Sequence, residues 1–258
     1  YVALGDSFTA GPGIPRQVGP DGCGRSDRNY PSVLAERLDV ASFVDVSCSG
    51  AATTELRTGQ RTAGDRVPPQ LAALSGRTDL VTVGLGGNDF AIFGRIVTLC
   101  PVVALSDPDG APCRRFFRAG GEDALLESVR RVRDRLTRGL RVVRARAPSA
   151  QVLVVGYPRI VPSRGTCPQV LPFATGDYRY AELVERRLNA ALRAAARATG
   201  ARFVDTYGPS RGHDVCAGPD AWVNGQRRTA AAAPYHPFAR GMAGVAAAVQ
   251  EVLTPGRG

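Results

Sequence analysis

The sequence predicts an α/β fold: a three-layer sandwich with a central, mostly parallel, five-stranded sheet. Short apolar runs of the kind seen in buried parallel strands alternate with longer segments whose apolar residues recur at helical spacing. Alternation of this kind is typical of a parallel sheet with helices on both faces. The expected strands are residues 1–5, 42–47, 79–85, 151–156 and 202–205, and the expected long helices are residues 29–38, 122–147, 177–199 and 237–253.

The first expected strand ends at Gly5 and is followed directly by Asp6 and Ser7. In an open α/β sheet, ligands bind in the crevice beyond the carboxyl ends of the strands, so Ser7 lies at a favourable place for a functional residue. An isolated Asp-Ser pair after a strand would more simply cap the next helix. The first long helix expected, residues 29–38, has apolar residues at helical spacing and a proline, Pro31, suited to its first turn.

Two further strands end in small or polar residues. The strand at residues 42–47 runs into a loop that contains Gly50, and the strand at residues 79–85 ends in Gly86-Gly87-Asn88-Asp89. Between Phe90 and Gly121 we expect an irregular segment, in which Phe116 and Phe117 could border a substrate groove. The amphipathic pattern that follows predicts the long helix over residues 122–147.

The last third of the chain repeats the alternation of strand and helix. The strand at residues 151–156 ends at Tyr157-Pro158, and Gly200 closes the helix over residues 177–199. A loop containing His213, Trp222 and His236 precedes the final helix. With 258 residues and no stretch that resembles a linker, the chain is expected to form one domain, residues 1–258.

Six cysteines are scattered along the chain, and none belongs to a CxxC pair. Because only two histidines accompany them, a zinc site is disfavoured and no metal or other cofactor is expected. An even, scattered set favours three disulfides and an oxidising, extracellular location. Six cysteines allow fifteen pairings, and closing the shortest loops in order gives Cys23 with Cys48, Cys100 with Cys113, and Cys167 with Cys216.

The net charge of +10 would ordinarily suggest nucleic acid as a partner. Every basic residue, however, is an arginine, and the arginines are spread along helices instead of forming one patch with aromatic residues between them. We therefore expect no nucleic-acid partner and interpret most arginines as a solvated surface, to which transient attraction to an anionic lipid surface is secondary. The lack of lysine excludes a P-loop and a Schiff-base nucleophile.

Polar clusters around Ser7, Gly50 and Asn88 follow three separate strands, and a histidine, His236, precedes the last helix. Acyl transfer needs such a set: a nucleophile, a base that takes its proton, and donors for the oxyanion. These blocks, Gly5-Asp6-Ser7-Phe8, Gly50, Gly86-Gly87-Asn88-Asp89 and His236-Pro237, resemble in order those of the SGNH or GDSL hydrolases. The cysteine-bearing loops are most similar to those of the family's secreted actinobacterial lipases and esterases. The resemblance implies a flavodoxin-like hydrolase fold with disulfide-stapled loops.

The resemblance also implies the role of each residue. Ser7 would attack the ester carbonyl, and the backbone N–H groups of Ser7 and Gly50 and the side-chain amide of Asn88 would hold the oxyanion. His236, not His213, would be the general base, because His213 lies beside Asp214 and Cys216 in what we expect to be a structural loop. Asp6 is expected to hold loop backbone, and Trp222 to serve either the core or an acyl groove.

The chain departs from the family three residues before the histidine, where most members carry an aspartate and this chain has Ala233. A backbone carbonyl, at Ala233 or Pro234, could accept the Nδ1–H of His236 and fix its tautomer without supplying charge. Such a carbonyl would make the site a dyad of Ser7 and His236. The alternative is an aspartate from another loop, Asp205, Asp214 or Asp220.

These observations predict a secreted serine esterase or lipase that hydrolyses carboxylic esters of small molecules or acyl lipids, acts as a monomer and is present here without its signal peptide. Phospholipase A1 activity lies within this class. Two alternatives stay open: an acetyl esterase acting on polysaccharide with the same fold, and a secreted binding module with little catalytic activity.

Overall fold

The computed structural model describes residues 1–254 and contains the predicted parallel sheet. Its strands lie in the order β4-β1-β7-β8-β9, and all neighbouring pairs are parallel. The strands are β1 (Val2–Gly5), β4 (Val44–Asp45), β7 (Leu80–Gly84), β8 (Gln151–Val155) and β9 (Arg202–Val204). Two short antiparallel pairs, β2 (Gln17–Val18) with β3 (Arg25–Ser26) and β5 (Gln60–Arg61) with β6 (Arg66–Val67), lie outside this sheet.

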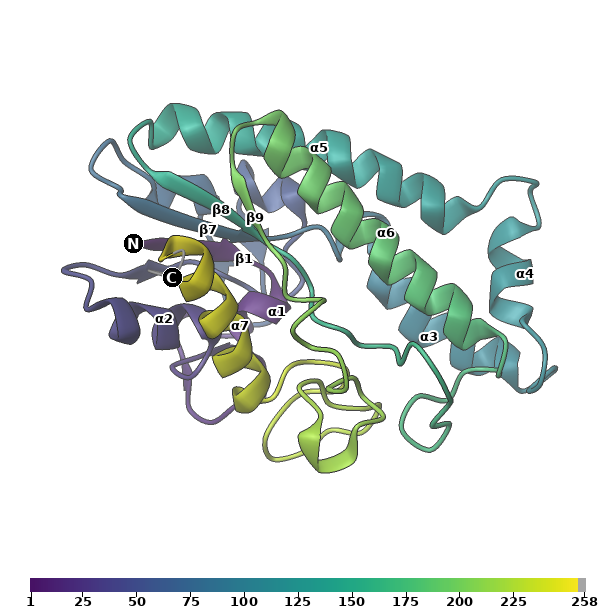
Figure 1. Ribbon diagram of the computed structural model, residues 1–258. Helices are drawn as coiled ribbons and strands as arrows, with labels where there is room; N and C mark the ends of the chain where they lie inside the picture. Colours follow the sequence, from purple (N-terminus) through teal and green to yellow (C-terminus); the bar gives the residue numbers. More distant parts are fainter. Residues whose placement is uncertain (255–258) are drawn as a thin grey trace.

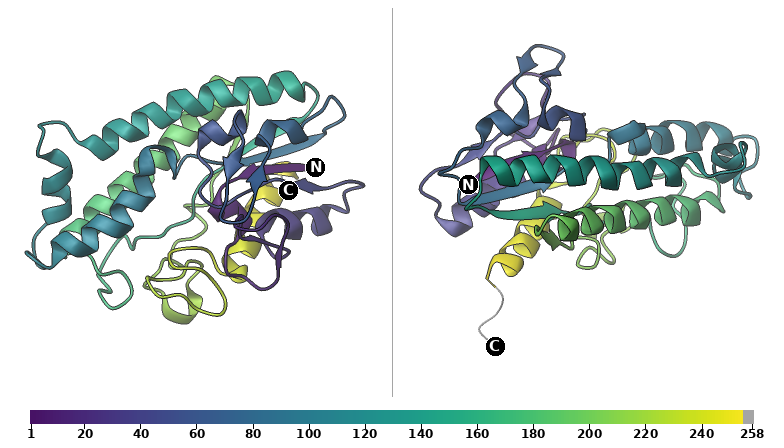
Figure 2. Two further views of the ribbon diagram at one scale, coloured as in Figure 1. Left: turned by 180° about the vertical axis from the view of Figure 1, so that it is seen from behind. Right: turned by 90° about the horizontal axis from the view of Figure 1, so that it is seen from above.

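Helices cover both faces of the sheet, which gives the predicted three layers (Figure 1). Helices α2 (Tyr30–Leu38) and α7 (Ala239–Leu253) pack together on one face, and α5 (Ala124–Arg146) and α6 (Asp177–Ala198) pack together on the other. Two further helices, α3 (Ile92–Ala104) and α4 (Pro112–Arg118), extend beyond the end of the sheet toward the tips of α5 and α6 (Figure 2). The shortest helix, α1 (Ser7–Ala10), follows β1, and the remaining helical turns are 3₁₀ turns at Thr53–Leu56, Gln70–Ala73, Asp89–Ala91 and Gly218–Asp220.

Side chains of the central strands alternate between two apolar cores. Val2, Leu4, Val81 and Val83 belong to the core beneath α5 and α6, whereas the core beneath α2 and α7 contains Ala3, Leu80, Leu153 and Val155. Because successive strand residues point to opposite faces, continuous apolar runs are required where both faces are covered. This requirement explains why the strands could be recognised in the sequence.

One predicted region is wrong. Residues 90–121, expected to be irregular, contain helices α3 and α4. Two features obscured α3: Pro101 lies inside it, and it carries a single charged residue, Arg95, so it shows little contrast between an apolar and a polar face.

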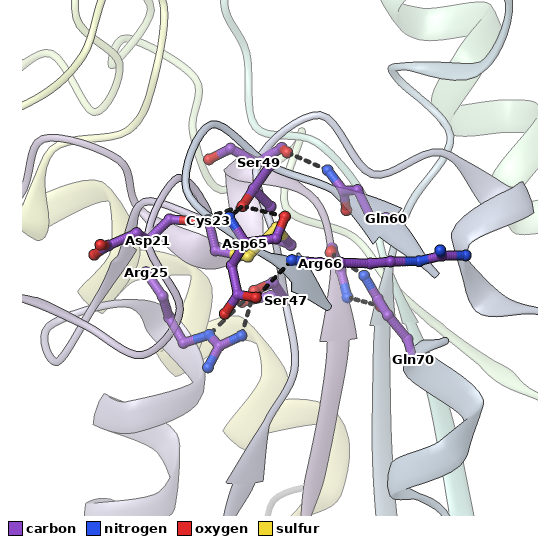
Figure 3. Close-up of a disulfide and its surroundings, with 12 residues drawn as sticks. Asp21, Cys23, Arg25, Ser47, Ser49, Gln60, Asp65, Arg66 and Gln70 are labelled. Carbon is purple, nitrogen blue, oxygen red and sulfur yellow. Dashed lines mark hydrogen bonds between the residues drawn. A yellow bond between two sulfur atoms is a disulfide. The ribbon is translucent and has the colours of Figure 1, made fainter. Parts of the chain in front are cut away.

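The three disulfides are Cys23–Cys48, Cys100–Cys113 and Cys167–Cys216, as predicted by closing the shortest loops. The first of them joins the segment before β3 to the loop that follows β4 (Figure 3). Arg25 donates to the carbonyl of Ser47 beside it, and the side-chain amide of Gln60 donates to the carbonyl of Ser49 at 2.7 Å. The disulfide and these bonds fix the loop that contains Gly50.

Candidate active site

Ser7 is the first residue of α1, directly after the central strand β1. Asp6 is the N-cap of this helix, and its Oδ1 accepts from the N–H of Phe8 at 2.9 Å. The capping role considered for the Asp6-Ser7 pair therefore belongs to Asp6. The N–H of Ser7, as the first of the helix, has no partner within the helix and is free to bind an oxyanion.

The turn before Ser7 is held from two sides. The side-chain amide of Gln70, which is buried, donates to the carbonyl of Gly5 and accepts from its N–H, both at 2.8 Å. A Cβ on Gly5 would collide with Thr9, whose Oγ1 would be 2.1 Å away, so only glycine fits between β1 and the first turn of α1. These contacts fix the backbone of the Gly5-Asp6-Ser7 turn.

Asp6 also belongs to a buried network with Tyr157, which follows β8. The hydroxyl of Tyr157 lies 2.5 Å from Asp6 Oδ2 and accepts from the N–H of Gly87 at 2.7 Å. One hydroxyl thus joins the turn after β1 to the loop after β7 that carries Asn88. Burial raises the pKa of Asp6 to about 7, although the hydrogen bonds from Tyr157 and Phe8 oppose the shift.

Asn88 is half-buried and lies at the end of the same loop. Its Nδ2 donates to the carbonyl of Ala51 at 3.0 Å, which leaves the second N–H of the amide available. The neighbouring Asp89 is buried and accepts from the N–H and the hydroxyl of Thr53 at 2.8 and 2.6 Å. Asn88 and Asp89 therefore tie this loop to the loop after β4, immediately past Gly50.

Gly50 itself has a φ of +81°, in the left-handed region that favours glycine. It is exposed, and a Cβ there would meet only the side-chain amide of Gln60, 3.6 Å away. The backbone conformation, not crowding, therefore selects glycine here.

His236 lies in the turn before α7, and its Nδ1 is 2.7 Å from the carbonyl oxygen of Pro234. Tyr235, between them, has a φ of +60°, which is unusual for a residue other than glycine and allows the ring to fold back onto this carbonyl. The carbonyl of Ala233 accepts instead from the N–H of His236 and from the side chain of Asn224. Burial lowers the pKa of His236, and the bond to Pro234 partly opposes that shift.

The other candidates for these roles have different partners. His213 Nδ1 lies 2.7 Å from the carbonyl of Asp220, and its ring stacks on Trp222 with the ring centres 5.0 Å apart. Asp205 accepts from the N–H groups of Tyr207 and Gly208, and Asp214 accepts from that of Cys216. All of these contacts belong to the structural loop before α7.

A cavity of about 180 Å³ is lined by polar residues of the candidate site and by apolar side chains. Ser7, Asn88 and His236 line it together, and the ring of Phe8 lies 5.5 Å from that of His236, centre to centre. Most of its other lining residues are apolar and come from α3, α6 and the loop after β8, although the carboxylates Asp6 and Glu185 also line it. Its apolar side chains include Phe93, Ile96, Val97, Ile160, Leu171 and Phe173.

The cavity does not include every residue that the sequence suggested near the site. Gly50 does not line it, although Asn88 contacts the next residue, Ala51. Phe117 is buried in the core and Phe116 is exposed on α4, so neither borders the cavity. Trp222 is half-buried and packs against Gly241 and Gly244 of α7 and against the core, so it does not line the cavity.

Comparison with known proteins gives the family. The GDSL-like lipase/acylhydrolase family matches residues 3–243. The chain belongs to this family. It is 39% identical to Lipase 2 of Streptomyces coelicolor, an alignment that covers 98% of this chain and 85% of that protein.

Solved structures of this GDSL-like group show the same fold. The crystal structure of phospholipase A1 from Streptomyces albidoflavus NA297 superposes with a TM-score of 0.78 at 30% identity, covering 97% of this chain and 98% of that chain. An extracellular lipase from Streptomyces rimosus gives a TM-score of 0.74 at 27% identity and covers 97% and 98%. Together with the family, these relatives show that the chain is a carboxylic ester hydrolase.

Three residues that position the site of this GDSL-like hydrolase were not predicted: Tyr157, Asn224 and Tyr235. Tyr157 follows a buried strand, as Ser7 and Asn88 do, so the same rule of strand ends could have identified it. Asn224 fixes the conformation of the loop before His236, because its side chain donates hydrogen bonds to the carbonyls of Ala232 and Ala233, each at 3.1 Å. Neither Asn224 nor Tyr235 belongs to a recognisable sequence pattern.

Proposed function

We propose that the chain is a secreted serine esterase or lipase that forms an acyl-enzyme on Ser7. The observation that carries this proposal is that Ser7, Asn88 and His236 line one cavity, most of whose other lining residues are apolar. Ser7 Oγ attacks the ester carbonyl while His236 Nε2 takes its proton, and the alcohol leaves after His236 returns that proton. Water then attacks the acyl-enzyme while His236 takes a proton from it. His236 returns that proton to Ser7 Oγ as the carboxylic acid leaves.

In this proposal the carbonyl of Pro234 replaces the usual aspartate. Its contact with Nδ1 places the proton of the neutral ring there and leaves Nε2 free to accept. A carbonyl supplies only part of a negative charge, so it stabilises the imidazolium less than a carboxylate would. Burial lowers the pKa of His236, and the bond to this carbonyl opposes only part of that shift.

The oxyanion would be held by the N–H groups of Ser7 and Gly50 and by Nδ2 of Asn88. The contact of Asn88 with Ala51 and that of Asp89 with Thr53 support this arrangement, because they hold the two donor loops together. Pre-oriented donors of this kind supply a large share of catalysis in acyl transfer.

The apolar wall favours an ester with an acyl chain over the acetyl groups of a polysaccharide, since an acetyl group would leave most of the wall unused. The relative from Streptomyces albidoflavus is named a phospholipase A1, which places phospholipids among the substrates to test. The three disulfides support an extracellular location. The monomeric state and the lack of a nucleic-acid partner stay predictions.

A series of p-nitrophenyl esters from acetyl to palmitoyl tests both the activity and the acyl preference. We expect turnover with a preference for chains longer than acetyl, and labelling of Ser7 by an organophosphonate that Ser7→Ala abolishes. An acetyl preference would favour the polysaccharide esterase. Absence of both turnover and adduct would favour the binding module.

A further inference from the structure

The most exposed large apolar side chains of the described residues lie together in sequence on α3 and α4. Five large apolar residues are exposed: Leu105 at 86%, Val102 at 62%, Phe116 at 53%, Val18 at 45% and Val44 at 41%. The first three belong to α3 with its C-cap and to α4, which the disulfide Cys100–Cys113 joins. Exposure of this degree at three neighbouring positions often marks an interaction site.

Val102 and Leu105 are part of an uncharged strip on the outer face of α3. The strip consists of Gly94, Thr98, Val102 and Leu105, all exposed and spaced by three or four residues, so that they share one side of the helix. It is about 17 Å long at 1.5 Å per residue. The only charged residue of α3, Arg95, lies outside the strip, with its guanidinium 4.7 Å from the ring centre of Phe117.

Other exposed helix surfaces of this protein are different. The outer positions of α5 are almost all charged, as at Arg130, Arg133 and Asp134. In a chain with 33 arginines, the α3 strip is therefore a marked exception. One of its ends is at the active site, because Gly94 lines the same cavity as Ser7 and His236.

Helix α4 places cations beside the far end of the strip. Arg114, Arg115 and Arg118 lie on one face of α4, and α3 and α4 together form the end of the molecule opposite α2 and α7 (Figure 1). Arg115 pairs with Asp107. Within residues 1–254, neither Arg114 nor Arg118 has an ion pair, so both charges are available to a partner.

We propose that the α3 strip and the α4 arginines form the surface by which this hydrolase docks onto an anionic lipid surface. Apolar side chains that enter the interface, with arginines beside them for acidic headgroups, are the combination that binds proteins peripherally to membranes. A nucleic acid binds through its phosphates and would gain no contact from the uncharged strip. Among the described residues, no helix has the length and apolar character needed to span a bilayer. The inference rests on the proposed function, because it describes how an acyl lipid reaches the cavity that Gly94 lines.

Vesicle binding tests the surface independently of catalysis. Sedimentation with vesicles of ether-linked phosphatidylcholine, with or without about 30% ether-linked phosphatidylglycerol, avoids hydrolysis of the probe. We expect the pair Val102→Ser and Leu105→Ser to weaken binding to both vesicles at least about tenfold. The pair Arg114→Gln and Arg118→Gln should weaken binding to anionic vesicles by about fivefold per arginine, and added salt should remove this difference.

The matched control is the pair Val18→Ser and Val44→Ser, which alters two exposed valines outside α3 and α4 and should bind as the wild type does. The strip variants should keep kcat/KM on soluble p-nitrophenyl butyrate within about twofold, while losing hydrolysis of vesicular lipid. The proposal is wrong if the strip variants still bind, if the control loses as much, or if sedimentation velocity shows that the strip instead pairs two copies of the chain. If the wild type binds vesicles through the strip but hydrolyses no ester, the proposed function fails and the docking surface stands.

Discussion

Replacing Tyr157 by phenylalanine tests whether its hydroxyl positions the nucleophile turn and the loop of Asn88 together. That hydroxyl contacts Asp6 Oδ2 at 2.5 Å and accepts from the N–H of Gly87 at 2.7 Å. Both partners are buried, so the variant removes a hydrogen bond to a carboxyl group and leaves a buried N–H without a partner. The ring itself remains, and its packing against Phe8 and Phe93 should be unchanged.

Loss of stability and loss of turnover should both follow. A buried hydrogen bond to a charged group contributes about 1.5–3 kcal/mol, and an unsatisfied buried N–H costs about 1–3 kcal/mol, so we expect a loss of about 3 kcal/mol. Because Gly87 precedes Asn88 and Asp6 precedes Ser7, small shifts of both groups should lower kcat by about tenfold to a hundredfold. Tyr157 does not line the cavity, so KM should change little.

Tyr180→Phe is the matched control. Tyr180 is buried, and its hydroxyl donates to Asp123 Oδ1 at 2.9 Å, but no residue of the candidate active site is involved. Asp123 keeps its bonds from the N–H groups of Leu125 and Leu126, so the cost in stability should be about 1–2 kcal/mol with kcat unchanged. Urea unfolding followed by circular dichroism, with kcat and KM on p-nitrophenyl butyrate, measures both effects. A Tyr157→Phe enzyme with wild-type kcat would refute the reasoning.

Three further predictions concern the proposed chemistry and the pH dependence. Asn88→Ala should lower kcat by about a hundredfold to a thousandfold, as loss of one oxyanion donor does elsewhere; an unchanged rate would remove Asn88 from the oxyanion hole. His236→Ala should abolish turnover, whereas His213→Ala should not. In the wild type, kcat/KM on a soluble ester should fall with decreasing pH only below the ordinary histidine pKa of 6.5, because burial lowers the pKa of His236. Burial raises the pKa of Glu185 from 4.5 to about 8, so its contribution to folding is full below pH 4.5 and is lost as pH rises through 8. Unfolding free energy should therefore fall over this range, by at most about 5 kcal/mol from this residue, and Glu185→Gln should flatten the decline; an equal slope in the variant would contradict the assignment.

The sheet could be predicted because burial on both faces imposes a pattern that is visible in the sequence. Val81 and Val83 face one core and Leu80 the other, so apolar residues are needed at consecutive positions of β7. The same topology explains why Ser7 and Asn88 could be expected at one edge of the sheet, since each directly follows a parallel strand or its terminal glycines. The disulfide pairs also followed from sequence separation alone.

The contacts that refine the site could not be predicted in the same way. The carbonyl near His236 depends on the positive φ of Tyr235, and a tyrosine gives no sign of that conformation. Of the two candidate carbonyls, that of Ala233 already accepts from the N–H of His236 and from Asn224, a contact over nine residues. Sequence reasoning could establish that a partner for Nδ1 was needed but not which atom supplies it.

The largest error in the prediction concerns helix α3, which has a part in both proposals: it lines the cavity and carries the docking strip. Helix α3 resembles neither an amphipathic helix nor a strand because its inner side chains, such as Phe93 and Ile96, form the cavity wall while its outer face is also uncharged at Val102 and Leu105. A helix that is apolar on both sides needs a second apolar environment. On the docking proposal that environment is a lipid surface. The uncharged outer face, which made α3 hard to predict from the sequence, is then also the face that brings an acyl chain to the cavity.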